Sequence, residues 1–313
     1  MSKLTLPAAT GSAAEAPPAP PAARPLPLGV RLVRLALVLG PLLGLVAAVV
    51  LFWGWGFGWV ELGLFLGMYL VTSLGVTVGF HRLFTHGSFE THAAVKFILA
   101  ALGSMAAQGS VLDWVAVHRR HHQHSDKDED PHSPHHHGRG LFGVMRGLWH
   151  AHIGWMLRQG PTGLSRYVKD LRRSVSLRVA SALFPLWVVL GLLIPAVLGG
   201  LLTWSWWGAL LGLLWGGLAR MFLFHHVSWG VNSICHLWGG RPHESGDHST
   251  NNVLLGLLAL GEGWHNNHHA FPTSARHGLR WWQIDVSYYS IKALALIGLA
   301  WNVRLPALQE AAT

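Results

Sequence analysis

The chain has 313 residues, of which 51% are apolar and only 12% carry a charged side chain. Its mean hydropathy is +0.34, and the charged fraction is half of the ~25% that is usual in soluble domains, which indicates a membrane protein. The net charge of +9 is spread along loops that flank apolar runs, so no nucleic-acid partner is predicted. A single cysteine, Cys235, excludes an intrachain disulfide and a cysteine-based zinc site.

The chain begins with a segment rich in Ala and Pro, residues 1–28, which predicts a disordered tail. Four apolar stretches follow, each near the ~20 residues that a membrane-spanning helix needs. They are predicted at about 30–53, 59–80, 183–203 and 208–225. Short turns rich in Trp or Gly join them in pairs, which predicts two hairpins. The expected fold class is therefore an all-α integral membrane protein.

A long polar region, 81–180, separates the two pairs of spans. Within it, residues 93–111 are apolar but short and carry Lys96 and Gln108, which predicts an interfacial or buried helix instead of a span. Residues 29–302 are expected to form one domain, with a last helix near 288–301 and a C-terminal tail at 303–313.

Lys and Arg residues fix the expected orientation. They gather before the first span, in 81–180 and after 226, whereas both turns between paired spans lack them. The positive-inside rule then places both termini and the large polar region in the cytoplasm. All three histidine-rich stretches described next fall on that side, so they can share one site.

Histidine is the outlier in the composition, with 22 residues. Three stretches concentrate it: HRLFTH at 81–86, HRRHHQH at 118–124 and HNNHH at 265–269. In the last two, histidines recur at i, i+3 and i+4, so a helix would hold three imidazoles on one face, converging on one point. Imidazole nitrogen suits iron, zinc and copper, and each stretch therefore predicts part of a metal site.

The number of candidate ligands predicts two metals, each with three to five histidines. The three stretches offer more imidazoles than one octahedral ion can use, and His236 is a further candidate because it stands at i, i+4 from Asn232. The absence of thiolates and the scarcity of carboxylates are compatible with redox-active iron or copper. The candidate ligands in the three stretches are His81, His86, His118, His121, His122, His265, His268 and His269.

Other residues of the same types are expected to have ordinary roles. His92, His243, His248 and His277 are predicted to be surface or core histidines, and the run 135–137 a solvated loop. Most of the 17 Trp residues are expected in interfacial belts. Trp114 and Trp229 differ because each stands a few residues before a candidate ligand, where it can wall a substrate channel.

Four sequence motifs occur in this order along the chain: HRLFTH, HRRHHQHSDKDEDPH, NSICHLWG and GEGWHNNHHAFP. With the apolar hairpins around them, they resemble the membrane-bound fatty acyl-CoA desaturases of the stearoyl-CoA (delta-9) type, in a bacterial-like form. The likeness covers residues from about 60 to 302. It implies four transmembrane helices that carry a cytoplasmic helical cap with a histidine-rich di-metal site.

The resemblance also implies a cofactor and an activity. Two irons would be held by nine histidines, which on this chain are the eight above and His236, with Asn232 bound through water. The activity implied is O2-dependent insertion of a cis double bond into a long-chain fatty acyl chain, at delta-9 of acyl-CoA, in unsaturated fatty acid biosynthesis. Trp114 and Trp229 match positions near the acyl tunnel, and Gln108 and Trp155 are the other expected substrate-binding residues.

The implied partners are an acyl carrier and an electron donor. Animal members of the family carry an Arg-Asp pair that contacts CoA, where this chain has Ala116 and Val117. CoA is the first expectation, with acyl carrier protein or an intact phospholipid left open. Electrons are expected from a separate ferredoxin, cytochrome b5-like protein or flavoprotein reductase. The Arg and Lys residues of 139–178 fit such docking or lipid head groups equally well.

Three other functions compete with this prediction. A di-iron hydroxylase or ketolase would use the same histidine stretches. A metal transporter would need ionisable ligands inside the spans, which hold almost none. A soluble carboxylate di-iron enzyme would use the Glu-x-x-His words at 129–132 and 262–265, but the first contains Pro131 and four long amphipathic helices are missing.

Overall fold

The computed structural model describes residues 26–157 and 163–306. Most of the predicted tail 1–28 and the end of the predicted tail 303–313 therefore lie outside the described residues. The described chain is mostly helical, and its two short strands, β1 (Glu90–Thr91) and β2 (Ala300–Trp301), pair antiparallel with Glu90 opposite Trp301.

In the described part of the chain, four helical segments are long and apolar enough to cross a membrane. The second and fourth continue beyond the predicted ends near 80 and 225, to Thr85 and His236, so the second includes His81. The segments consist of α1 (Leu28–Leu51); α2 (Trp59–Leu74) with the π-helix η1 (Gly75–Thr85); α8 (Phe184–Thr203); and α9 (Trp206–Gly212), the π-helix η5 (Leu213–Ala219), α10 (Arg220–Ser233) and the 3-10 turn η6 (Ile234–His236).

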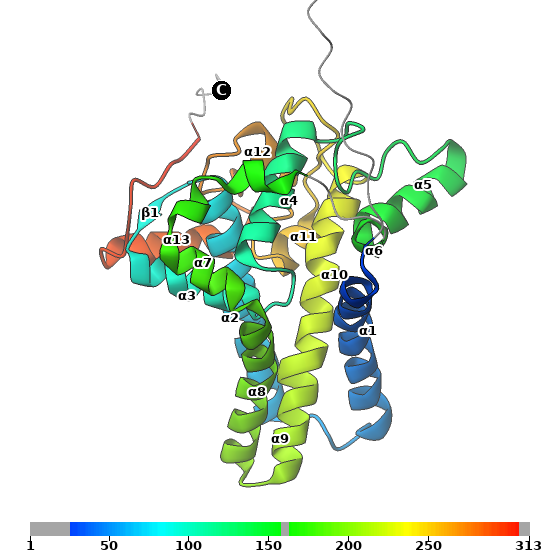
Figure 1. The fold of residues 1–313 in the computed structure, drawn as a ribbon, viewed down its shortest axis with the longest axis vertical. Coiled ribbons are helices and arrows are strands. Elements are labelled where there is room, and N and C mark those ends of the chain that lie inside the picture. Colours follow the sequence, from blue (N-terminus) through cyan, green and yellow to red (C-terminus); the bar gives the residue numbers. More distant parts are fainter. Residues whose placement is uncertain (1–25, 158–162, 307–313) are drawn as a thin grey trace, which may run out of the picture.

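The remaining elements gather at one end of these long helices (Figure 1). The short apolar helix predicted within 93–111 is α3, which packs against η1 and has no spanning length. These elements are α3 (Ala93–Ser104), α4 (Val111–His124), α5 (Gly140–Trp149), the π-helix η2 (His150–Gly154), α6 (Trp155–Leu157), the 3-10 turns η3 (Leu164–Val168) and η4 (Leu171–Arg173), α7 (Val175–Ala182), α11 (Val253–Leu258), α12 (His265–Ala270) and α13 (Val286–Leu296).

Small residues set the distances between the long helices. A Cβ at Gly199 of α8 would lie 2.2 Å from the carbonyl oxygen of Gly208 on α9, and one at Gly44 of α1 would lie 2.4 Å from Cβ of Leu218 in η5. Glycine at these points lets the backbones approach closely, as is common between helices in membranes. The assignment of the four segments to two hairpins across a bilayer stays a prediction.

A buried arginine holds the loop that leads into α4. Arg220 is fully buried and donates to the carbonyl oxygens of Met105 at 3.2 Å and Gly191 at 2.7 Å, while His225 Nε2 lies 2.8 Å from the carbonyl oxygen of Ala106. A buried cation is tolerated where such acceptors surround it. Because these two side chains of α10 hydrogen-bond to this loop, they fix the start of α4 relative to the long helices.

Gly75 marks the closest approach of η1 and α3, since a Cβ there would lie 2.1 Å from the backbone nitrogen of Gly103. Gly75→Ala should push the two helices apart and lower stability by about 1–3 kcal/mol. The thermal unfolding midpoint of the detergent-solubilised protein measures this. Gly67→Ala on α2 is the matched control, because nothing lies within 4 Å of its added Cβ. Equal midpoints for the two variants would contradict the close packing.

Candidate metal centre

Nine histidine side chains meet in two adjoining groups at the end of the bundle where the short helices gather. Within each group, one ring nitrogen of every residue lies within 4.8 Å of the others. The groups abut, because the rings of His122 and His269 stack with centroids 4.5 Å apart. The five-histidine group is His81, His86, His118, His122 and His268, and the four-histidine group is His121, His236, His265 and His269.

Helix α4 divides its three histidines between the groups. His118 and His122 have their Nε2 atoms 3.1 Å apart, whereas His121 faces the other group, with its ring centroid 5.2 Å from that of His269. Helix α12 divides likewise, with His268 in the five-histidine group and His265 in the other. On an α-helix, i+3 and i+4 lie roughly 60° and 40° to opposite sides of i. The expectation that one helix aims three imidazoles at one point was therefore wrong, since this spread serves two neighbouring points.

A π-helix brings His81 and His86 together. The backbone nitrogen of His86 donates to the carbonyl oxygen of His81 at 3.2 Å, which is the i+5 pattern of this helix, and the two ring centroids are 4.9 Å apart. Five residues along an α-helix would turn a side chain to about 140° from the first. The wider turn of η1 is thus the reason that both imidazoles join the same group.

The spacing and isolation of the ring nitrogens fit a metal ion in each group. Nε2 of His268 lies 3.0 Å from Nε2 of both His81 and His122, and Nε2 of His236 lies 3.0 Å from that of His265. Two nitrogens bound at right angles to one metal, each about 2.1 Å from it, are about 3.0 Å apart. Five ring nitrogens in the two groups are buried and have no hydrogen-bond partner among the described residues: Nε2 of His86, His121 and His269, and Nδ1 of His265 and His268.

Carboxylates hold the outer nitrogens of four of these imidazoles. A carboxylate at Nδ1 keeps the proton there and leaves the Nε2 lone pair free for a metal, which orients the ring and strengthens the ligand. The pairs are His121 with Asp130 at 3.0 Å, His236 with Asp126 at 2.9 Å, His269 with Asp247, and His81 with Glu262.

The sequence pattern does not reveal these carboxylates as partners of the histidines, although the two groups themselves contain histidine alone, in line with the expected scarcity of carboxylate ligands. Their one signal is that Asp126, Asp130 and Glu262 belong to the quoted motifs that contain histidines. Glu262 stands three residues before His265, as a soluble di-iron motif would require. In the structure it instead contacts His81.

Burial keeps the imidazoles in the form that binds metal. It lowers the pKa of His269 to about 4 and, with repulsion from neighbouring histidines, lowers the pKa of five others well below the usual value. Burial would also lower the pKa of His121, but the Asp130 carboxylate prevails and raises it. Burial opposes the charge on Asp130, yet His121 holds the pKa of that carboxyl well below its usual range. The five others are His86, His118, His122, His265 and His268.

Arg82 and His277 both contact Glu262, the carboxylate that pairs with His81. Arg82 is fully buried, with Nη2 3.0 Å from Oδ1 of Asp285 and 3.2 Å from Oε1 of Glu262. The same Nη2 lies 3.0 Å from Nδ1 of His277, whose ring centroid is 4.4 Å from that of His268. His277, expected to be an ordinary histidine, is thus part of the wall of the site.

The other histidines with expected ordinary roles belong to neither group. His92 packs against Trp301 and His243 against Phe271, while the backbone nitrogen of His248 donates to Asp126 at 2.8 Å. The run 135–137 lies in a loop, as expected. One of its side chains also reaches the site, because His135 Nε2 lies 3.0 Å from the carbonyl oxygen of His236.

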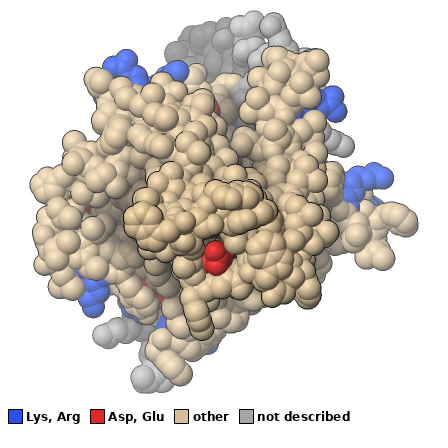
Figure 2. All heavy atoms as spheres, turned by 90° about the horizontal axis from the view of Figure 1, so that it is seen from below, with Lys and Arg blue, Asp and Glu red and all other residues tan. Residues whose placement is uncertain are grey.

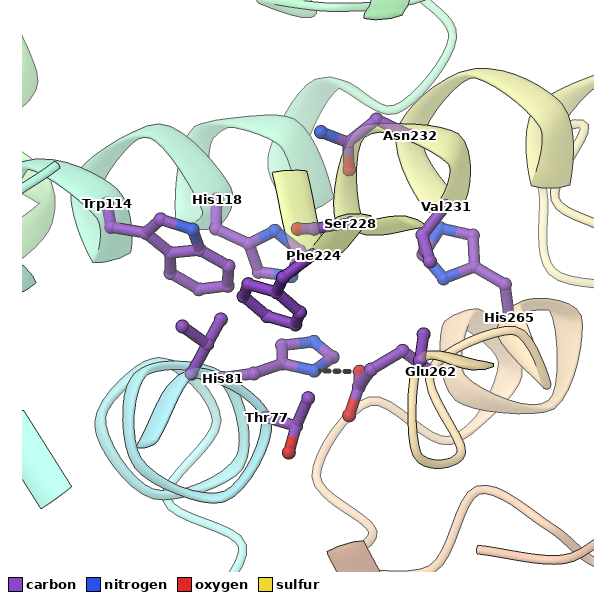
Figure 3. Close-up of a pocket in the computed structure, with 12 residues that line it drawn as sticks. Thr77, His81, Trp114, His118, Phe224, Ser228, Val231, Asn232, Glu262 and His265 are labelled. Carbon is purple, nitrogen blue, oxygen red and sulfur yellow. Dashed lines mark ion pairs between the residues drawn. The ribbon is translucent and has the colours of Figure 1, made fainter. Parts of the chain in front are cut away.

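Two cavities reach the five-histidine group. The smaller, of about 40 Å³, is lined by His81 and His118 together with Thr77 and Phe224 (Figure 3). The larger, of about 580 Å³, lies between α1, α4 and α10, and its size is typical of ligand pockets. Asn232 lines both cavities, so the structure places it beside the histidines, one turn before His236.

The four predicted substrate residues all line the larger cavity: Gln108, Trp114, Trp155 and Trp229. The ring of Trp114 stacks on His118 with centroids 4.8 Å apart. Gln108 accepts a hydrogen bond from Ser228, but its Nε2 and Nε1 of Trp155 are buried without a partner in the described chain. A buried donor left unpaired costs about 1–3 kcal/mol, so both are suited to bind polar atoms of a ligand.

His132 is a further residue of this wall that the spacing of the histidine stretches did not single out. It lines the larger cavity, its Nδ1 has no hydrogen-bond partner among the described residues, and its ring centroid is 4.4 Å from that of His121. It therefore lies between the cavity and the four-histidine group. The sequence feature that could have indicated His132 is its position in the Asp-Pro-His motif at 130–132.

Apolar helices that end in histidines around a buried cavity are typical of a membrane-bound metal-dependent oxidoreductase. Residues 55–295 match the model of the fatty acid desaturase family, and the chain belongs to this family of oxidoreductases.

Relatives with named activities support this assignment. The chain is 46% identical to a hex-5-enoyl-[acyl-carrier protein] acetylenase of Moorena producens, over 85% of this chain and 84% of that protein. It is 40% identical to an sn-1 stearoyl-lipid 9-desaturase of Anabaena variabilis, over 80% and 86%. It is 41% identical to an icosanoyl-CoA 5-desaturase of Limnanthes douglasii, over 74% and 62%. The expected resemblance to desaturases is confirmed, while these names differ in carrier and in position.

Proposed function

We propose that this protein is an O2-dependent di-iron desaturase that introduces a cis double bond at delta-9 of a long-chain fatty acyl substrate. The observation that carries the proposal is the pair of adjoining histidine groups at the wall of an apolar cavity. An all-nitrogen donor set with carboxylates on its outer side suits redox-active iron. One domain, residues 29–302, would contain the whole site.

In this proposal the nine histidines are the iron ligands, and Asn232 reaches one iron through water. When bound and reduced, the irons would supply the O2 chemistry that removes two hydrogens from adjacent methylenes. Over a turnover, O2, those two hydrogens, two donor electrons and two protons give two waters and the alkene. No further catalytic residue is proposed.

The side chains around the cavity would choose the carbon that reacts. A methylene chain offers no polar group to recognise, so position must come from the depth to which the chain enters. Trp114 stacks on His118 and would hold the chain against the five-histidine group. The unpaired donors of Gln108 and Trp155 would bind the polar end of the substrate. Trp229 lines the same cavity beside them.

The protein would lie in a bacterial inner membrane with the histidine groups and both termini in the cytoplasm. Lys and Arg flank the ends of the long helices that lie near the histidines, whereas the opposite end, seen in Figure 2, shows them only at its outline. This is the bias of cytoplasmic loops. A separate ferredoxin, cytochrome b5-like protein or flavoprotein reductase would then reach the site from the cytoplasm.

The test is expression in a bacterial host that lacks its own desaturase, followed by gas chromatography and mass spectrometry of the total lipids. The expected result is a new monounsaturated fatty acid with its cis double bond at carbon 9, which requires aeration and iron. Fractionation of the lipids before hydrolysis, together with assays on stearoyl-CoA, identifies the acyl carrier.

Other products would overturn parts of the proposal. A hydroxylated or keto fatty acid without an alkene would assign the chain to a hydroxylase or ketolase on the same scaffold. An alkyne formed from an alkene would match the acetylenase relative. Metal uptake without any change in the lipids would favour a transporter.

A further inference from the structure

We propose that Arg172 and Arg178 bind a phosphate group attached to the acyl substrate, in a pocket beside the acyl cavity. This inference rests on the proposed function, because it names the chemical class of the substrate's head. Two kinds of carrier share this chemistry: a glycerophospholipid, and the phosphopantetheine thioester of CoA or of acyl carrier protein. Each places a phosphate beyond the acyl carbonyl.

The pocket adjoins the larger cavity. Its volume is about 520 Å³, and it lies between the first turns of α4 and the segment from η3 to the start of α8. Four residues line both spaces, so a ligand whose chain fills the larger cavity can extend its polar head past them into the pocket. The shared residues are Ser110, Asp113, Leu164 and Phe184.

The two arginines of the pocket are free to bind an anion. Both are exposed, and neither guanidinium group has an ion pair or hydrogen bond within residues 26–157 and 163–306. Their neighbour Arg119 differs, since it donates to both carboxylate oxygens of Asp170, at 2.8 and 3.0 Å. A guanidinium group presents parallel donors that match phosphate oxygens. Two such groups at one pocket therefore favour an anion such as a phosphate.

The carboxylate in the lining does not cancel this charge. Asp113 accepts a hydrogen bond from Ser110 Oγ at 2.7 Å, and Ser110 Oγ in turn accepts one from Ser181 Oγ at 2.8 Å. The lining holds two cations and this one anion. Its net charge stays positive.

The place of the pocket matches the depth of a lipid head group. Arg178 lies on α7, which directly precedes the apolar helix α8, and α7 sits at the end of α8 nearest the histidine groups (Figure 1). Ala116 lines the same pocket. Arg172 on η4 and Arg178 on α7 supply the cations of this pocket.

The experiment measures binding to Arg172→Gln/Arg178→Gln. Three probes share a stearoyl chain: stearoyl-CoA, 1-stearoyl phosphatidylglycerol, and 1-stearoyl monogalactosyldiacylglycerol, which has no phosphate. The dissociation constant of each is measured by equilibrium binding to the detergent-solubilised protein. Hydrogen bonds to a charged group contribute about 1.5–3 kcal/mol, so the dissociation constant of a phosphate probe should rise roughly tenfold or more. That of the galactolipid should stay unchanged.

The matched control is Arg146→Gln/Arg173→Gln, which removes the same charge from exposed arginines outside the pocket. Weaker binding of phosphatidylglycerol alone assigns the site to phospholipid, and weaker binding of stearoyl-CoA alone assigns it to the thioester. Equal weakening of the galactolipid, an equal effect of the control, or unchanged binding of both phosphate probes overturns the proposal.

Binding does not depend on turnover, so the two proposals fail separately. A wild-type chain that binds a phosphate probe through these arginines but makes no alkene retains the site and loses the proposed function. A chain that makes the alkene while the double variant binds phosphate probes normally retains the function and loses the site.

Discussion

Replacing His121 by alanine should abolish desaturation while the chain remains folded in the membrane. His121 is one of four imidazoles in its group, and the change also removes the imidazole partner of the buried Asp130 carboxylate. Loss of an outer-shell partner alone typically costs 10–100-fold, so loss of the ligand should cost more than about a hundredfold in turnover. Iron per purified chain, measured by elemental mass spectrometry, should fall to one or below.

His124→Ala is the matched control for this change. His124 lies on the same helix three residues further on, outside both groups, and its Nε2 is 3.4 Å from the exposed carboxylate of Glu129. This variant should keep the iron content and the turnover of the unmodified chain. Full turnover in His121→Ala would refute the ligand assignment.

Replacing Asp126 by asparagine should weaken iron binding without removing a ligand. Asp126 is buried, and one of its oxygens lies 2.9 Å from His236 Nδ1 and accepts from the backbone nitrogen of His248 at 2.8 Å. Burial opposes its charge, but His236 holds the pKa of this carboxyl well below its usual range. An amide of the same size loses the charge and an acceptor, so the orientation of His236 suffers.

The expected loss in metal affinity is about 10–100-fold, as for other outer-shell partners. Turnover titrated against added Fe²⁺ should therefore require more iron for half-maximal rate and should recover in excess iron. Asp128→Asn is the control, because that side chain is 95% exposed two residues away. An iron titration of Asp126→Asn that overlays the control would show that Asp126 does not support the metal.

The sequence predicts the parts of this protein that depend on local pattern. Four stretches near 20 residues long were enough to locate the apolar helices, because hydropathy over that length reflects the membrane directly. The nine histidines that meet in the structure are the nine that the histidine spacing and the family motifs predicted as metal ligands. Spacing such as that of His118 and His122 determines a shared helix face.

Features that depend on the fold could not be predicted. Asp126 and His236 are 110 residues apart, so no window of sequence contains both. The division of His118 and His121 between two groups depends on where the neighbouring helices stand. The π-helix η1 has a composition that an α-helix would also accept. Only the structure shows that its wider turn aligns His81 with His86.

The division of α4 and α12 between the two histidine groups has a thermodynamic consequence. A metal bound in one group would fix the orientation of both helices, and the entropy of ordering them would then already be lost when the second metal arrives. Each binding event would therefore raise the affinity for the other, and the coupling would be reciprocal. Iron should enter this protein cooperatively, so that scarce iron yields a mixture of empty and fully loaded chains, with few that hold a single ion.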